Sequence, residues 1–296
     1  MSRQETPAQF YGYYINLDRS NARRERFDAQ LARFGLSARY SRIPAIDGRT
    51  AKLPASKVTP GEGGCFLSHC RALEEGRTRG TPVHILEDDA VLSAHTAPVI
   101  EDAIAARLFD RVDILFTDSL FQCHLGMLKS LKAAFDRIKL PEAGPAKLAD
   151  LQLLDLSQQS FSCLTSYVVA PRAIDRLLAM MRQEIAAGPR TPADLFVRDA
   201  VHAGKLRAAC VFPFVTSFDL DEVARSTIGE GGEAPAKPSV MVLAVLRNSF
   251  FLGGDLDNAK RHLDAATKKG RKPTNAHHDL IVQALEFVVS DDFQEF

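Results

Sequence analysis

Short apolar runs alternate with amphipathic segments along most of the chain. A run of apolar, aromatic and β-branched residues bounded by turn residues is typical of a buried strand, whereas apolar positions three or four apart indicate a helix. The expected strands are 11–17, 38–46, 83–86, 112–117, 164–170 and 206–215, with an edge arm at 148–156; the expected helices are 22–34, 65–77 after a loop at 60–64, 96–107, 129–139, 171–181 and one opening at 191–195. This alternation predicts an α/β sandwich with a mainly parallel sheet.

Acidic residues follow the expected strands at their carboxyl ends, where ligands of parallel α/β sheets bind. They are Asp18, Asp47, the triplet Glu87-Asp88-Asp89, and Asp118. Three adjacent carboxylates repel one another and are costly to desolvate, and a divalent cation would offset both costs. Oxygen ligands suit Mg²⁺ or Mn²⁺, which proteins commonly share with substrate phosphates. The triplet therefore predicts a metal and diphosphate site, with acids that simply begin the next element as the alternative.

Composition narrows the class of protein. The chain has 296 residues, of which 46% are hydrophobic and 25% charged, as in an ordinary soluble globular protein. Lys+Arg 37 equals Asp+Glu 37, so no overall field favours nucleic acid as a partner. The five cysteines match no zinc or redox spacing and are expected to be reduced thiols. With no signal-peptide pattern and no apolar run of membrane-spanning length, we expect a cytoplasmic protein, with peripheral attachment at the inner face of the cytoplasmic membrane left open.

Five segments in order resemble motifs of glycosyltransferase family 25, the group of lipooligosaccharide galactosyltransferases and collagen galactosyltransferases. The segments are 14–19 with Arg23, 45–48, 61–69, 86–89, and the pair 165–169 and 192–195. The resemblance covers about residue 10 to residue 228. It implies a GT-A-like Rossmann-type α/β/α sandwich, a UDP-sugar donor, and Mn²⁺ or Mg²⁺ as the cofactor. Among UDP-sugars, UDP-galactose is the expected donor.

The resemblance also implies roles for individual acids. Asp89 and Glu87 are expected to bind the metal. Asp219 is expected as a third ligand, with His202 and Asp118 as alternatives to it. Asp194 is the candidate catalytic base, which would take the proton of the acceptor hydroxyl if the anomeric centre inverts; a first-turn helix acid is the alternative. Asp88 is the second candidate catalytic residue, either supporting the metal ligands or contacting the ribose.

A further set of residues is expected to bind the donor nucleotide. The set comprises Asn16, Leu17, Arg23, Asp47, Ser68, His69 and Glu87. Arg23 could pair with phosphate oxygens through its planar fork, or be a surface arginine. Asp47 could contact the uracil or ribose, or simply form an Asp-Gly turn. Ser68 and His69 follow a glycine-rich loop near an expected helix start, where backbone amides favour phosphate; a packed or capping histidine is the alternative.

We expect three regions, namely a glycosyltransferase domain at 1–228, a Gly- and Pro-rich linker at 229–238, and a helical extension at 239–296. Helices are expected at 240–251, 255–267 and 279–289. The extension would dock on the core or form a homodimer, or else bind a partner or acceptor. The expected activity is hexose transfer to a sugar of a surface glycan such as lipooligosaccharide or capsule. A protein or peptide acceptor, a non-catalytic nucleotide-sugar or glycan-binding protein, and a metal-dependent hydrolase are the alternatives.

Overall fold

The computed structural model describes residues 9–121, 125–223, 238–255, 257–259 and 261–262. Within them, seven strands form a central sheet in the order β2-β1-β3-β9-β5-β10-β7. Strands β2 (Tyr40–Pro44), β1 (Tyr11–Asn16), β3 (Val83–Glu87), β5 (Ile114–Phe116) and β10 (Ala208–Phe212) share one direction, whereas β9 (Ser166–Val169) and the edge strand β7 (Gln152–Asp155) run against it. The expected mainly parallel sheet is confirmed.

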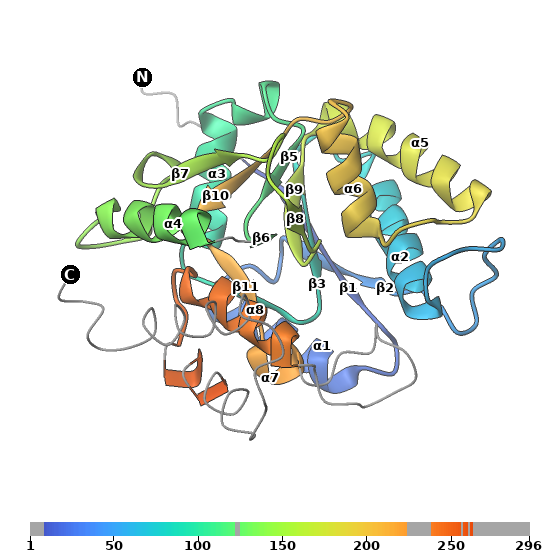
Figure 1. Ribbon diagram of the computed structural model, residues 1–296, viewed down its shortest axis with the longest axis horizontal. Coiled ribbons are helices and arrows are strands. Elements are labelled where there is room, and N and C mark those ends of the chain that lie inside the picture. The colour runs from blue at the N-terminus through green and yellow to red at the C-terminus, as the bar shows by residue number, and fades with distance from the viewer. Residues whose placement is uncertain (1–8, 122–124, 224–237, 256, 260, 263–296) are drawn as a thin grey trace.

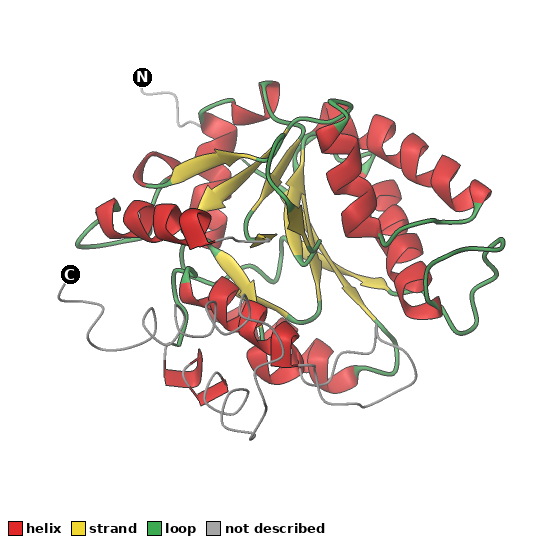
Figure 2. Cartoon of the chain, viewed as in Figure 1, coloured by secondary structure: helices red, strands yellow, loops and turns green. Residues whose placement is uncertain are grey.

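Helices surround the sheet, as Figures 1 and 2 show. Helices α2 (Pro60–Gly76), α5 (Pro171–Ala187) and α6 (Ala193–His202) pack together on one side of the sheet, and α3 (Thr96–Ala105) lies on the other. Near the end where β1 and β3 finish lie α1 (Asn21–Arg33), α7 (Leu220–Val223) and α8 (Pro238–Ser249). The remaining described helices are α4 (Leu125–Arg137) and two 3₁₀ turns, Leu108–Asp110 and Leu148–Asp150. None of the described helices has both the length and the apolar character needed to cross a membrane.

A two-stranded ribbon follows the acidic triplet directly. Strand β4 (Ala90–Leu92) pairs antiparallel with β11 (Thr216–Phe218), and β6 (Leu120–Phe121) pairs with β8 (Phe161–Ser162) in a second ribbon. The strand expected at 206–215 is wrong in its extent, because β10 ends at Phe212 and the chain re-enters a strand only at Thr216. The intervening Pro213 has no amide hydrogen to give to a sheet ladder.

The loop expected at 60–64 is also wrong, because helix α2 already begins at Pro60. The hydroxyl of Thr59 accepts a hydrogen bond from the amide of Glu62 (3.3 Å), and the Glu62 carboxylate accepts one from the amide of Thr59 (2.8 Å). This capping box starts the helix despite its glycines. The glycines instead permit close packing: a Cβ on Gly64 would lie 2.5 Å from the carbonyl oxygen of Ile46.

The C-terminal expectation is confirmed only for its first helix, since α8 occupies most of the expected range 240–251. Residues 257–259 and 261–262 are helical, as expected for the start of the second helix. The other parts of the expected extension, 263–267 and 279–289, and most of the expected linker, 229–237, lie outside the described residues. The division at residues 228 and 239 stays a prediction.

A buried histidine joins three strands in the middle of the sheet. The Nδ1 atom of His84 shares a 2.7 Å hydrogen bond with the Tyr40 hydroxyl, and its Nε2 atom shares one of 2.8 Å with the Ser166 hydroxyl. The side chain is fully buried, and burial lowers the pKa of His84 to about 3. In the unfolded chain the same imidazole takes up a proton below about pH 6.5. The unfolded state therefore binds more protons than the folded state between these values.

We expect acidification to weaken the fold through His84. Between pH 7 and pH 5 this residue alone should lower the free energy of unfolding by about 2 kcal/mol. Urea denaturation at both pH values should show a smaller loss for His84→Gln than for the wild type, because glutamine does not titrate. The matched control is His202→Gln, which removes an exposed histidine from α6. Equal pH dependence in His84→Gln and the wild type would contradict the assignment.

Candidate active site

The three acids at the end of β3 face different neighbours. Glu87 is the last residue of the strand, and Asp88 and Asp89 form the turn into β4. Glu87 contacts side chains of α2, whereas Asp88 contacts β1 and α1. Alternation of side chains along extended chain accounts for this division. The triplet therefore offers three chemically distinct positions.

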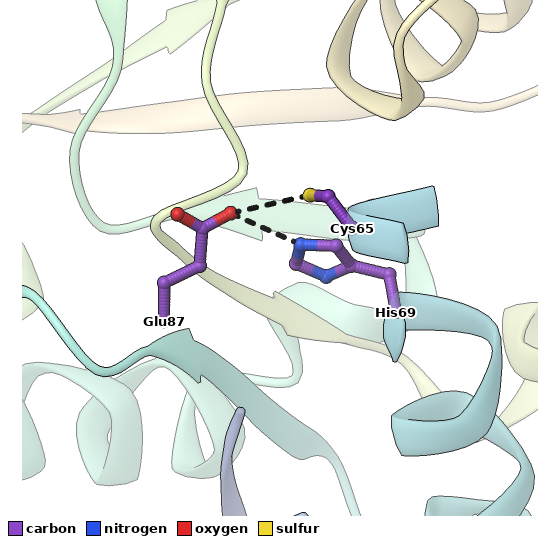
Figure 3. A group of neighbouring side chains, drawn as sticks. All are labelled: Cys65, His69 and Glu87. Carbon is purple, nitrogen blue, oxygen red and sulfur yellow. Dashed lines mark hydrogen bonds and ion pairs between the residues drawn. The ribbon is translucent and has the colours of Figure 1, made fainter. Parts of the chain in front are cut away.

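Helix α2 holds Glu87. His69 Nε2 donates to Glu87 Oε1 at 3.2 Å, and the Cys65 thiol donates to the same oxygen at 3.7 Å (Figure 3). The other ring nitrogen of His69 shares a 3.0 Å hydrogen bond with the Tyr167 hydroxyl. Burial opposes ionisation of Glu87, but the hydrogen bond and charge of His69 outweigh it, and the pKa of Glu87 is lowered. Burial, reinforced by Glu87, raises the pKa of the Cys65 thiol well above its usual value.

Asp88 is held from the opposite side. Asn16 Nδ2 donates to its Oδ2 at 2.7 Å, and Arg23 Nη1 to its Oδ1 at 3.3 Å. Arg23 also donates from Nε to Glu222 at 2.8 Å, and Arg42 fixes the Asn16 amide with a 2.8 Å bond to its Oδ1. Burial raises the pKa of Asp88 more than Asn16 and Arg23 lower it. Three residues expected to meet the donor or do chemistry thus form one connected group.

Asp89 differs because one of its two carboxylate oxygens has no hydrogen-bond partner in the part of the chain that the structure describes. This oxygen, Oδ1, is buried. Burial, together with the charges of Glu87 and Asp88, raises the pKa of Asp89 to about 7. The β4–β11 ribbon brings the backbone of Asp219 beside that of Asp89, and the Asp219 amide donates to the Asp89 carbonyl oxygen at 2.9 Å. The Asp219 carboxylate itself accepts from the Asp221 amide at 2.9 Å and pairs with Arg26 at 3.6 Å. A buried carboxylate oxygen without a partner suits a hard cation, so Asp89 fits Mg²⁺ or Mn²⁺, although among the described residues Asp89, Asp219 and Glu87 do not converge into one group of ligand atoms.

Sequence reasoning missed Arg247, a buried cation that α8 brings to the same sheet edge. Its guanidinium bonds the buried carboxylate of Asp118, which follows β5, and lies 4.4 Å from the ring centre of Phe218. Burial raises the pKa of Asp118 to about 6, although the charge of Arg247 opposes this. The Nε atom of Arg247 is buried and has no hydrogen-bond partner within the described ranges. The sequence showed only an apolar segment here, because nothing local marks an arginine as buried.

The chain around α8 is anchored to the segment that joins β10 to β11 and to β11 itself. The Phe214 amide donates to the Phe250 carbonyl oxygen, and the Leu252 amide donates back to the Phe214 carbonyl oxygen, both at 2.8 Å. Asn248 Nδ2 donates to the Ser217 hydroxyl at 3.3 Å. The residues that directly follow Arg247 are therefore held against the sheet edge.

Asp194 lies in the first turn of α6 and accepts two backbone hydrogen bonds. Its Oδ2 accepts from the Cys163 amide at 3.0 Å, and its Oδ1 from the Leu195 amide at 2.8 Å. Cys163 has a left-handed φ of 77°, so Asp194 secures a strained turn. The described hydrogen bond of His202 goes to the Gln159 carbonyl oxygen at 2.8 Å, not to the triplet.

Ser68 and Asp47, which are expected to bind the donor nucleotide, both have partners within the protein. The Ser68 hydroxyl donates to the Gly64 carbonyl oxygen at 2.6 Å and accepts from the Ile46 amide at 2.8 Å. Because α2 begins at Pro60, Ser68 and His69 lie well inside the helix, and the expectation that they sit near its amino end is wrong. Asp47 pairs with Arg19 and Arg49, and hydrogen bonds from Arg49 are the main cause of its lowered pKa.

A basic cavity of about 590 Å³ opens beside the amino end of α1. It is lined by Arg19, Ser20, Asn21, Arg23, Arg26 and Glu222, among others. Leu17 lies in the turn that leads into it, and its carbonyl oxygen accepts from the Ser20 amide at 2.9 Å. Since Arg23 contacts both this cavity and Asp88, the basic cavity adjoins the acidic triplet.

A mainly parallel α/β sheet with charged residues collected at its strand ends is the architecture of an enzyme that binds its ligand there. The family model for glycosyltransferase family 25, described as LPS biosynthesis protein, matches residues 11–197. The match covers more than half of the chain, and the chain belongs to this family, whose members are glycosyltransferases. No curated protein gives a significant match.

We expect Arg247→Met to destabilise the protein by about 3–5 kcal/mol, because it leaves the Asp118 charge buried and unpaired. Denaturant titration of the purified variant measures this loss. The double variant Arg247→Met, Asp118→Asn should recover part of it, since no uncompensated charge remains. A surface control is Arg107→Met, which removes an exposed pair with Asp110 and should cost less than about 1 kcal/mol. A loss no larger than that of the control would show that the buried pair contributes little.

Proposed function

We propose that this glycosyltransferase moves a hexose, galactose from UDP-galactose, onto a sugar of a surface glycan such as lipooligosaccharide, lipopolysaccharide or capsule. The single observation that carries the proposal is the buried, unpartnered Oδ1 of Asp89 within an acidic triplet at a strand end of a family 25 chain. A site of this kind suits a cation that is shared with a nucleotide diphosphate.

Asp89 would hold the cation. Of the two further ligands expected from the sequence, Asp219 has its backbone beside Asp89 but its carboxylate on Arg26, and Glu87 faces α2 and is not assigned to this cation. When bound, a divalent cation neutralises the charge of a diphosphate leaving group. The chain's own residues keep this position available. His69 and Cys65 turn Glu87 towards α2, Asn16 and Arg23 hold Asp88, and Asp89 alone retains a buried oxygen without a hydrogen bond.

The basic cavity is the proposed site of the donor nucleotide. Arg23 is pinned between Asp88 and Glu222, so its guanidinium is already oriented at the cavity wall. Arg19 and Arg26 line the same wall, where Arg19 pairs with Asp47 and Arg26 with Glu222, and Glu25 also lines it. An arginine held in place by carboxylates binds phosphate with little loss of side-chain entropy. Asn16, Leu17 and Asp47, from the β1 and β2 ends, would contact the uridine.

Asp194 is the proposed base for inversion, with Asp88 as the second candidate. The two backbone hydrogen bonds on Asp194 fix its carboxylate without filling its acceptor capacity, because an ionised carboxylate has about four lone-pair positions. A fixed carboxylate can accept the proton of an acceptor hydroxyl as that oxygen attacks the sugar. We further propose that the protein acts in the cytoplasm, at the inner face of the cytoplasmic membrane.

Calorimetric titration tests the donor and the metal together. UDP-galactose, UDP-glucose and UDP would be titrated into the protein with Mn²⁺ and with a chelator. We expect UDP-galactose to bind most tightly with Mn²⁺. Asp89→Asn should weaken binding by more than about a hundredfold, since it removes a charged metal ligand. The control Asp175→Asn removes an exposed carboxylate of α5 that pairs with Arg77, and should bind normally. If none of the three UDP species binds, either with Mn²⁺ or with the chelator, the donor assignment is wrong.

A separate experiment examines Asp194. If it is the base, Asp194→Asn should lower kcat by about a hundredfold or more while donor affinity stays unchanged. If it only secures the turn at Cys163, the folded variant should keep its kcat and lose stability instead. Steady-state kinetics with UDP-galactose, alongside a thermal unfolding curve for the same preparation, separates the two outcomes.

A further inference from the structure

We propose that Cys65, His69 and Glu87 form a binding site for one zinc ion, separate from the position of the hard cation at Asp89. The three side chains converge from two elements, the middle of α2 and the end of β3 (Figure 3). The inference concerns the ion that these side chains select, and it does not depend on the donor sugar or on the cation at Asp89.

The spacing of the three donor atoms is that of a zinc site. Glu87 Oε1 lies 3.2 Å from His69 Nε2 and 3.7 Å from Cys65 Sγ, and all three atoms lie within 4.8 Å of one another. Ligand atoms about 2.0–2.3 Å from a tetrahedral zinc lie roughly 3.3–3.8 Å apart. An ion could therefore enter with small side-chain adjustments, replacing two hydrogen bonds by three coordination bonds.

Local structure prepares this arrangement. Cys65 and His69 are four residues apart on α2, so both project from one face of the helix. The capping box at Thr59 fixes where that helix starts and hence which face meets β3. The Tyr167 hydroxyl lies 3.0 Å from His69 Nδ1, and a partner on the second ring nitrogen orients a histidine ligand. When Nδ1 carries the proton, the Nε2 lone pair faces Glu87.

Charge and ligand type favour zinc over magnesium or manganese. A zinc-bound cysteine is a thiolate, and its charge with that of Glu87 balances a divalent ion. Sulfur and imidazole ligands select zinc, whereas Mg²⁺ and Mn²⁺ prefer oxygen. The surroundings are suitably closed, since the His69 side chain is only 1% exposed and that of Glu87 22%. The sheet edge would thus offer two neighbouring metal positions, one with a sulfur and a nitrogen ligand for zinc and one with oxygen for Mg²⁺ or Mn²⁺.

Bound zinc would cross-link helix α2 to strand β3. It would hold Glu87 at the head of the triplet and neutralise one of the charges that act on Asp89. Three protein ligands leave a fourth position for water, as in zinc sites that are not fully closed.

Cobalt(II) is the probe for this site, because a cobalt-thiolate bond absorbs strongly in the near ultraviolet and oxygen ligands do not. Titration of metal-free full-length protein with Co²⁺ should give this band at one ion per chain, and Zn²⁺ should remove it. Cys65→Ser should abolish the band. Two controls should retain it: Cys70→Ser, which removes a buried thiol of the same helix, and Cys163→Ser, which removes a thiol of a neighbouring loop. No band in the wild type, or a band that persists in Cys65→Ser, would overturn the proposal.

A measurement on the wild type covers the case in which Cys65→Ser fails to fold. Zinc should slow alkylation of Cys65 by at least tenfold, as followed by peptide mass spectrometry, and leave Cys70 unaffected; equal alkylation of Cys65 with and without zinc would also overturn the proposal. Asp89→Asn separates this site from the proposed function. It should keep the cobalt-thiolate band while losing manganese-dependent donor binding, so that either assignment can fail without the other.

Discussion

Glu87, Asp88, Asp89 and Asp118 lie together at the ends of β3 and β5, where burial makes each negative charge costly. The chain meets this cost with a different element for each acid. Helix α2 supplies His69 to Glu87, β1 and α1 supply Asn16 and Arg23 to Asp88, and α8 supplies Arg247 to Asp118. Of these four acids, Asp89 is the one with a buried oxygen that has no partner among the described residues. Four elements distant in the sequence thus compensate the charge at this sheet edge, and the oxygen of Asp89 is where we propose a cation.

The local patterns in the sequence were sufficient for the sheet and for the position of the triplet. Apolar runs that end in acids identify strand ends without knowledge of the fold. The apolar residues indicate the buried strand, and the acids directly after them indicate the turn. The start of α2 was also readable in principle, since Thr59 and Glu62 have the capping-box spacing. The glycines that follow suggested a loop, and the packing of Gly64 against Ile46, which explains them, is a tertiary contact.

Contacts between distant residues account for what the sequence could not reveal. Arg247 and Asp118 are 129 positions apart, and no local signal separates a buried arginine from a surface one. The β4–β11 ribbon has strands of three residues, too short for a periodic pattern, yet it is this ribbon that brings Asp219 to Asp89. The cysteine spacing alone gave no sign of a metal, because the carboxylate that completes the Cys65 and His69 pair comes from a strand 18 positions beyond His69.

Helix α8 extends the folding unit beyond the part of the chain that matches the family model. The family match ends at residue 197, whereas the charge that balances Asp118, a residue inside the match, comes from residue 247. The stretch recognised as common ancestry is therefore smaller than the stretch that must fold together. Because residues 118 and 247 form one buried ion pair, a truncation between them would alter the charge of the sheet edge as well as the length of the protein.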